Sequence, residues 1–403
     1  MDTKSGYPWW TVSNGLIGQF PSLRTNTQCE VAVIGAGITG SLVAHALAEA
    51  GMDVLVIDRR EAGWGSTAAS TALLQYEIDT PLVDLIKRYG ETAARAYQAC
   101  DEAIDTLAGI VARMGEPVGF RPCGSLYFAS KRRHVATLKR EYQARQRHGL
   151  PVEQLDAAGV RERFGIDAPL ALWTPHAARL DPYRFARVML GQLGRRGVRV
   201  HDASEVQEWT AEPQGLRLRM SNGAQVRCAH LVVAAGYETQ RWLKQRVAVN
   251  HSSYALITEP LDTLPLQLED NVIWESARPY VYLRGTDDRR IIIGGEDDRL
   301  DLPAKRAAAL PRKVGKLMDR LRALAPDIQP ELAFSWAGTF AETDDGLPFI
   351  GNAPGHDPRV HFVMAYGGNG ITYSTIAAAM VRDAIQGKRH PLDALFGFGR
   401  LAG

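Results

Sequence analysis

The 403-residue sequence contains only four cysteines, and none of them belongs to a C-x-x-C pair. Neither a zinc site nor a disulfide framework is therefore indicated, and no other metal-ligand spacing is present. The chain also lacks any run of about 18 apolar residues, so we expect no membrane-spanning helix. Its first ten residues lack the apolar core of a secretory signal. These absences favour a cytoplasmic protein in a reducing compartment.

An excess of charge of one sign is absent too. The 47 Lys and Arg residues nearly balance 45 Asp and Glu residues, for a net charge of +2. We therefore expect neither nucleic acid nor an anionic membrane as a partner. The length exceeds that of a single core, which predicts two or three domains.

One stretch near the N-terminus has the clearest pattern in the sequence. Residues 31–34 form a short β-branched run that ends at Gly35, which predicts a buried strand. A G-x-G-x-x-G motif and an amphipathic run to Gly51 follow, and residues 54–57 predict a second strand that ends at Asp58. This order is typical of a Rossmann unit, which binds the pyrophosphate of a dinucleotide at the start of its helix.

Each residue of this motif has a physical role. Gly35 allows the tight turn, Gly37 lets backbone amides approach the pyrophosphate, and Gly40 lets helix and strand pack closely. Asp58 is placed to accept hydrogen bonds from a ribose. The motif alone leaves NAD and FAD open, and an α/β unit that binds a mononucleotide or no nucleotide stays an alternative.

A loop of small hydroxylated residues follows Asp58. Its Ser66 and Thr67 could bind phosphate or sugar, although an ordinary helix cap is the alternative interpretation. Further along the chain, we expect helices over residues 82–93, 96–111, 131–148, 183–196, 310–324 and 375–385. Expected strands cover residues 123–129, 197–200, 216–220, 225–228, 231–235, 254–258, 272–274, 278–284, 290–294 and 360–365.

Several motifs in this order resemble the FAD-dependent D-amino-acid oxidase family, which includes glycine oxidase and sarcosine oxidase. They are the dinucleotide motif, the Ser66-Thr67 loop, the strand ending at Gly236, the segment 345–351 and the glycine-rich segment 367–372. The resemblance implies an α/β fold with a Rossmann-like FAD-binding domain and a second α+β domain with a mostly antiparallel substrate-binding sheet. The implied FAD-binding domain is discontinuous, over residues 1–85, 175–243 and 336–403. Residues 86–174 and 244–335 would form the substrate-binding domain.

The resemblance also implies which residues bind FAD. The dinucleotide motif would hold the pyrophosphate, Asp58 the ribose and Val206 the adenine, while the last glycine-rich segment would contact the flavin. Most relatives have Glu at the position of Asp58, a small departure. The full implied set is Gly35, Ala36, Gly37, Ile38, Thr39, Gly40, Asp58, Arg59, Ser66, Thr67, Val206, Ala235, Gly236, Gly338, Gly367, Gly368, Asn369, Gly370, Ile371 and Thr372.

A second departure concerns attachment of the flavin. Relatives with covalent flavin have a cysteine or histidine at set positions. Here Gly338 and Thr339 occupy the region of the cysteine, and the loop after Ser66 has no histidine. We therefore expect non-covalent FAD.

Alternating residues in the β-rich region suggest a substrate site. Arg278, Tyr280, Tyr282 and Arg284 alternate with apolar residues, so a strand would place all four on one face. An arginine there could bind a carboxylate in bidentate fashion, although a solvated sheet face is the alternative. Further candidates are Tyr254, Trp336 and His251.

The leading functional hypothesis is an enzyme that oxidises an amine or amino acid of the glycine, sarcosine or D-amino-acid class. It would transfer a hydride to flavin N5 and reduce O2 to H2O2. The sequence shows no Ser-His-Asp arrangement, and the hypothesis assigns no acid or base. One alternative is a dehydrogenase of an amine or 2-hydroxy acid that passes electrons to a quinone or carrier protein. Another is a binding protein in which FAD is structural. The oligomeric state is not predicted.

Overall fold

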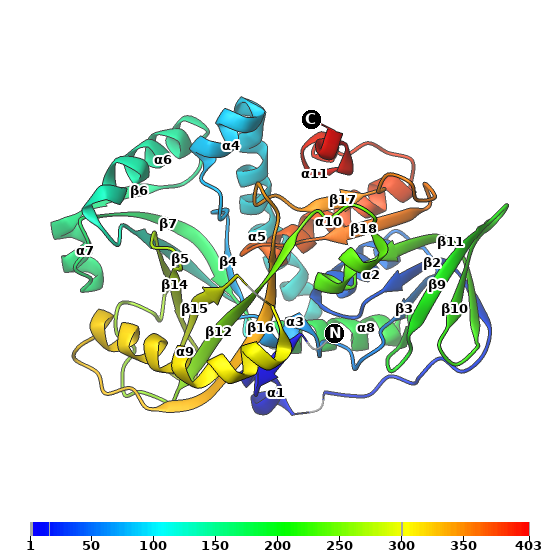
Figure 1. Cartoon of the computed structure of the whole chain (residues 1–403), viewed down its shortest axis with the longest axis horizontal. Helices are drawn as coiled ribbons and strands as arrows, with labels where there is room; N and C mark the ends of the chain where they lie inside the picture. Colours follow the sequence, from blue (N-terminus) through cyan, green and yellow to red (C-terminus); the bar gives the residue numbers. More distant parts are fainter. Residues whose placement is uncertain (1–2, 16, 300, 403) are drawn as a thin grey trace.

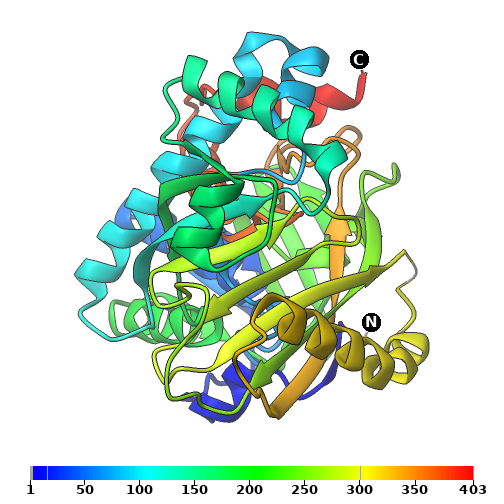
Figure 2. The same ribbon diagram turned by 90° about the vertical axis from the view of Figure 1, so that its left-hand side faces the viewer.

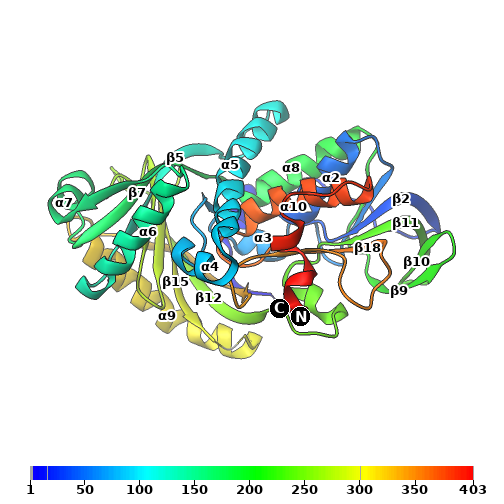
Figure 3. The ribbon, with the colours of Figure 1, turned by 90° about the horizontal axis from the view of Figure 1, so that it is seen from above.

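A computed structural model describes residues 3–15, 17–299 and 301–402 (Figure 1). Two sheets lie side by side, and each is covered by helices. Figure 3 shows the two halves from above, with the long helix α5 (Ala94–Met114) between them. This helix packs against α10 (Gly370–Ile385) of one half and against β4 (Leu73–Gln75) and β7 (Leu170–Arg179) of the other.

The first sheet contains the predicted dinucleotide unit. Its strand order is β17 (Phe349–Gly351), β18 (Val360–Met364), β11 (Gln225–Val233), β2 (Thr27–Ile34), β3 (Val54–Ile57) and β8 (Arg199–His201). The pairs from β18 to β8 are parallel, and β17 is antiparallel to β18. The hairpin of β9 (Val206–Glu212) and β10 (Gly215–Met220) extends from β11.

Alternation along β2 explains why both faces of this sheet are covered. Val31 and Val33 pack in the core formed with α2 (Ile38–Glu49), whereas Ala32 and Ile34 pack in the core formed with the β9–β10 hairpin. Helix α2 in turn contacts α8 (Pro182–Arg195) and α10. Because α2 begins four residues after the end of β2, its first turn lies at the carboxyl edge of the parallel strands, where ligands bind in open α/β sheets.

The second sheet runs in the order β1 (Lys4–Gly6), β16 (Leu332–Glu342), β12 (Val249–Thr258), β15 (Ile291–Asp298), β14 (Val281–Gly285), β13 (Asn271–Glu275), β5 (Arg121–Phe128), β7 and β4, with β6 (Glu153–Asp156) beside β7. Its pairs are antiparallel except for β13 and β5, which are parallel. Figure 2 looks onto this half, with α9 (Pro303–Leu324) in front of the sheet. The predicted fold class is confirmed.

The remaining helices are short or lie at the edge of the second half. They are α1 (Trp9–Asn14), α3 (Ser66–Ala69), α4 (Leu82–Tyr89), α6 (Val135–Arg147), α7 (Ala157–Phe164) and α11 (Asp393–Phe396), with 3-10 turns at Glu91–Ala93, Arg132–His134, Gly236–Trp242 and Phe398–Ala402. Within the described ranges, none of the helices combines the length and the apolar character that a membrane span requires.

The strand predictions differ clearly from the structure in two regions. The expected strands at residues 225–228 and 231–235 are one continuous strand, β11, because its first half pairs with β10 and its second half with β18. The strand expected from Arg278 begins only at Val281. The domain boundaries stay a prediction; β1 and β4, from a segment assigned to the FAD-binding domain, pair in the second sheet.

Candidate cofactor and substrate site

A large cavity is lined by residues of both halves of the molecule. Its empty volume is about 1990 Å³, open solvent at the mouth included. One part is lined by the loops after β2, β3 and β11, and the other by β12 to β16 and the segment before α10.

The glycine loop after β2 fits a closely approaching ligand. Gly35 has a φ of +112°, and a Cβ atom there would overlap the carbonyl group of Ala234. A Cβ at Gly40 would overlap the carbonyl oxygen of Gly35. Helix α2 begins directly after this loop, so its positive dipole end faces the cavity, as binding of a pyrophosphate requires.

Asp58 holds this loop in place from the end of β3. Its Oδ2 accepts a hydrogen bond of 2.7 Å from the Ala36 amide, and its Oδ1 accepts one of 2.8 Å from the Arg60 amide. Burial raises the pKa of the Asp58 carboxyl, and the two amides oppose that rise. Each oxygen can accept a further hydrogen bond, so the arrangement also fits ribose hydroxyls.

Charged side chains beside Asp58 form a network at this end of the cavity. Arg59 and Arg60 both pair with Glu238, and Arg241 lies 3.7 Å from Glu205. Val206, expected to lie against the adenine, lines the same part of the cavity. Nearby, the Thr67 hydroxyl accepts a hydrogen bond of 3.0 Å from the Ile38 amide at the start of α2.

The other end of the cavity contains the glycine-rich segment before α10. The Gly368 amide donates a 2.7 Å hydrogen bond to Oδ2 of Asp79, and the Asn369 side chain donates one of 2.9 Å to the Gln75 carbonyl. Gly370 and Ile371, the first residues of α10, line the cavity. The positive end of the helix dipole therefore faces any group that lies here.

Most of the cofactor residues expected from the sequence line this cavity. They are Gly35, Gly37, Ile38, Thr39, Asp58, Arg59, Ser66, Thr67, Val206, Ala235, Gly236, Gly338, Gly367, Gly368, Gly370 and Ile371. Four others, Ala36, Gly40, Asn369 and Thr372, are not among the lining residues. These residues contact the loops that line the cavity. The Thr372 hydroxyl, for example, donates a hydrogen bond to the Asn369 carbonyl and so fixes the segment before α10.

Of the expected substrate residues, four aromatic side chains line the cavity. They are Tyr254, Tyr280, Tyr282 and Trp336. The Tyr280 and Tyr282 rings lie 5.7 Å apart, and the Tyr254 hydroxyl donates a 2.8 Å hydrogen bond to Asp298. His251 lies outside the lining, 3.5 Å from Glu342.

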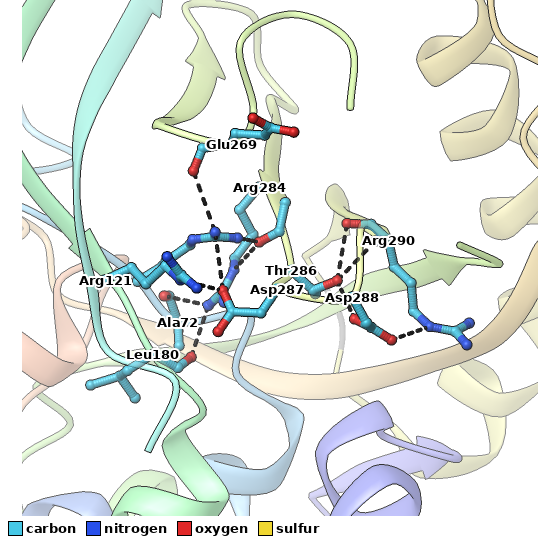
Figure 4. Close-up of polar contacts among 11 residues, drawn as sticks. Ala72, Arg121, Leu180, Glu269, Arg284, Thr286, Asp287, Asp288 and Arg290 are labelled. Carbon is cyan, nitrogen blue, oxygen red and sulfur yellow. Dashed lines mark hydrogen bonds and ion pairs between the residues drawn. The ribbon is translucent and has the colours of Figure 1, made fainter. Parts of the chain in front are cut away.

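The two arginines expected beside these tyrosines also lie outside the lining. Arg284 is buried, and its Nη1 donates hydrogen bonds of 2.8–3.0 Å to the carbonyl oxygens of Thr71, Ala72 and Leu180; Figure 4 shows the last two contacts. Arg278 is exposed and donates to the backbone carbonyl of Asp79. The expected common face does not form, because Arg278 and Tyr280 precede the first residue of β14.

Two acidic residues of the cavity were missed in the sequence. Asp79 and Asp297 line it near Tyr280, whose hydroxyl lies 3.3 Å from Oδ1 of Asp79. Burial and the charge of Asp79 raise the pKa of Asp297 to about 6. In the sequence, Asp297 stands in an acidic run, residues 296–298, after two glycines, and such a run is typical of a solvated turn. Across the described ranges, no cluster of three or more metal-ligating side chains occurs.

One cavity brings together a glycine loop at the carboxyl edge of a parallel sheet, a second glycine-rich helix start and an aromatic chamber formed by Tyr254, Tyr280, Tyr282 and Trp336. This combination defines a dinucleotide-dependent enzyme. Comparisons with known proteins agree. The family model described as "FAD dependent oxidoreductase" (DAO) matches residues 30–384. The chain belongs to this family, and it is an FAD-dependent oxidoreductase.

Individual relatives are distant in sequence but match over most of their length. The chain is 24% identical to gamma-glutamylputrescine oxidoreductase of Escherichia coli (strain K12), over 96% of this chain and 90% of that protein. It is 25% identical to glycine oxidase of Geobacillus kaustophilus (strain HTA426), over 90% and 94%. The crystal structure of glycine oxidase from Geobacillus kaustophilus superposes with a TM-score of 0.75 at 20% identity, covering 90% of this chain and 96% of that one.

Proposed function

We propose that this protein oxidises an amine or an amino acid and uses O2 as the electron acceptor, with release of H2O2. One observation carries the proposal. Asp79 contacts both the aromatic chamber and the glycine-rich start of α10. One of its carboxylate oxygens accepts a hydrogen bond from the Tyr280 hydroxyl, and the other accepts one from the Gly368 amide. A substrate among the aromatic rings would therefore lie beside the group bound at α10.

The chain's own residues would bind and orient the reactants. The loops at Gly35 and Gly368 would hold the two ends of FAD, which supplies the acceptor for a hydride from the carbon next to the substrate nitrogen. Partial positive charge at the start of α10 favours negative charge on the group that receives the electrons. Tyr280, Tyr282 and Trp336 would exclude water and fix the substrate in one orientation.

The test is a panel of amines and amino acids mixed with the purified, FAD-containing enzyme. Loss of the yellow flavin colour without oxygen would identify a substrate, and H2O2 release in air would identify an oxidase. Free FAD with the same compounds is the control. Bleaching by an amine without peroxide in air would instead support a dehydrogenase that uses a quinone or carrier protein. If no amine or amino acid bleached the flavin, the proposal would fail.

A further inference from the structure

The charged residues that line the cavity fall into two groups. At the end with Asp58, the arginines Arg59, Arg60 and Arg241 accompany the acids. At the end with the aromatic rings, Asp79 and Asp297 are the charged lining residues that the structure describes, and no lysine or arginine accompanies them. The chamber expected to receive the substrate is therefore acidic.

Asp297 differs from its neighbours on β15 because, among the described residues, it forms no ion pair with a lysine or arginine. Asp298 lies 2.7 Å from Nζ of Lys313, and Glu296 lies 3.2 Å from Nζ of Lys316. Glu296 has a φ of +56° where the register of β15 shifts against β12, and Asp297 lines the cavity whereas Glu296 and Asp298 do not. The Ser253 hydroxyl interacts with the Asp297 carboxyl, but the Oδ1 atom of that carboxyl is buried and has no hydrogen-bond partner among the described residues. Such an oxygen is costly unless a ligand compensates its charge.

The nearby arginines, Arg278 and Arg284, bind backbone carbonyl oxygens outside the chamber. Arg278 lies outside the lining, with its guanidinium 4.6 Å from the centre of the Tyr280 ring and bonded to a backbone carbonyl. Arg284 is fully engaged with carbonyl oxygens. A third acid, Glu342, lies close enough for both Asp79 and Asp297 to influence its carboxyl. Carboxyl groups therefore line this chamber, without a lysine or arginine among the described residues that line it.

The aromatic lining suits the same kind of ligand. Tyr282 lies flat against Gly294, where a Cβ atom would come within 2.5 Å of its ring, so a glycine is needed to keep the ring in this place. Trp274 and Tyr280 add further rings to the lining. Ring faces beside a carboxylate attract ammonium groups and offer nothing to a carboxylate.

We propose that Asp297, with Asp79, forms a cation subsite that binds a second ammonium group of the substrate. The substrate class is therefore a diamine or related polyamine, in which one nitrogen is oxidised and another, several carbons away, is bound as a cation. This inference rests on the proposed function and narrows it. It also replaces the carboxylate-binding arginine expected from the sequence, since neither Arg278 nor Arg284 lines the chamber.

The experiment compares three probes of similar length with the FAD-containing enzyme: putrescine, butylamine and γ-aminobutyrate. Binding is measured through the change in the flavin spectrum in the absence of turnover, and the rate of anaerobic bleaching is measured separately. Putrescine should bind about tenfold or more tightly than either other probe, because only it presents a second ammonium to the acids. The Asp297→Asn variant should lose that preference, and Asp297→Glu should keep most of it.

The matched control is Glu296→Gln, which removes the neighbouring carboxylate that pairs with Lys316 outside the cavity. It should bind all three probes as the wild type does, and equal FAD content in all variants would confirm that each one is folded. Equal or tighter binding of γ-aminobutyrate, no binding of putrescine, or an unchanged preference in Asp297→Asn would overturn the subsite. Selective binding of putrescine without bleaching by any amine would count against the proposed oxidation but not against the subsite.

Discussion

At the scale of single residues, Arg284 shows how a side chain suited to a substrate site can be structural instead. Its guanidinium binds three carbonyls on two segments that are far apart in the sequence, one at Thr71 and Ala72 and the other at Leu180. Burial and the nearby Arg179 lower the pKa of Arg284 to about 9, so the site holds a cation at neutral pH only at some cost.

We predict that Arg284→Met lowers the free energy of unfolding by about 1–3 kcal/mol, because buried carbonyls lose their donor. Arg278→Met, at an exposed position, should change it by less than about 0.5 kcal/mol. Denaturant unfolding of the FAD-containing variants measures both. An unchanged free energy of unfolding in Arg284→Met, together with a raised KM for carboxylate substrates, would instead support the prediction from the sequence that Arg284 binds a substrate carboxylate.

Asp297 gives a prediction for pH. Its pKa in the folded chain is raised from 3.8 to about 6, so protonation favours the folded state. This contribution is complete below about pH 4 and is lost as pH rises through about 6. The wild type should therefore lose about 1–3 kcal/mol of stability relative to Asp297→Asn over that interval.

Unfolding of the substrate-free proteins between about pH 4 and 7 measures this difference. The other titrating groups near Asp297, which include Glu342, are present in both proteins, so their contributions largely cancel. A stability difference that stays constant with pH would mean that Asp297 does not titrate in this range.

At the scale of elements, the loop between β2 and α2 depends on the absence of a side chain at Gly40. A Cβ atom there would overlap the Gly35 carbonyl, which belongs to backbone and cannot turn away. We predict that Gly40→Ala separates α2 from β2 and lowers stability by about 1–3 kcal/mol, with FAD affinity reduced in parallel. FAD content and thermal unfolding check this result.

The control is Gly191→Ala in the middle of α8, where an added Cβ meets no atom within 4 Å. Alanine has the higher helix propensity, so this variant should gain about 0.5–1 kcal/mol and keep its FAD. If both variants behaved alike, the close approach at Gly40 would not matter for binding.

The elements that could be predicted from the sequence have strong local patterns. The β2–α2–β3 unit has a β-branched run, three glycines and an amphipathic helix in succession, and α8 has Asp181 as its cap, which accepts a 2.9 Å hydrogen bond from the Arg184 amide. The two glycine segments follow β2 and β18, which run in the same direction in one sheet. Both segments therefore lie at the same edge of that sheet and line the cavity.

The elements missed in the sequence depend on partners distant in the chain. Strand β7 contains Pro175 and several alanines, and it is held by β4, β5 and β6. Strand β9 is mostly polar and pairs only with β10 among the described strands. Asp297 was missed for the same reason, since its place in the cavity depends on how far β15 extends beside β12 and β14.

At the scale of the whole molecule, both halves line the cavity that would hold FAD. At the two positions where relatives attach flavin covalently, the sequence has no cysteine or histidine. Gly338 and Thr339, in the region where the family resemblance implies the cysteine of covalent relatives, line the cavity. We predict that acid precipitation releases the yellow colour into the supernatant. Colour retained in the washed pellet would show a covalent bond and would contradict the prediction.

The position of β18 has a consequence for synthesis on the ribosome. This strand, Val360–Met364, lies beside β11, which comes more than a hundred residues earlier in the chain, and the segment that follows it forms one end of the cavity. Until it emerges, β11 has an unpaired apolar edge, which is a site for misassembly. Cofactor capture must therefore come after Ile371, the last cavity-lining residue, has been translated.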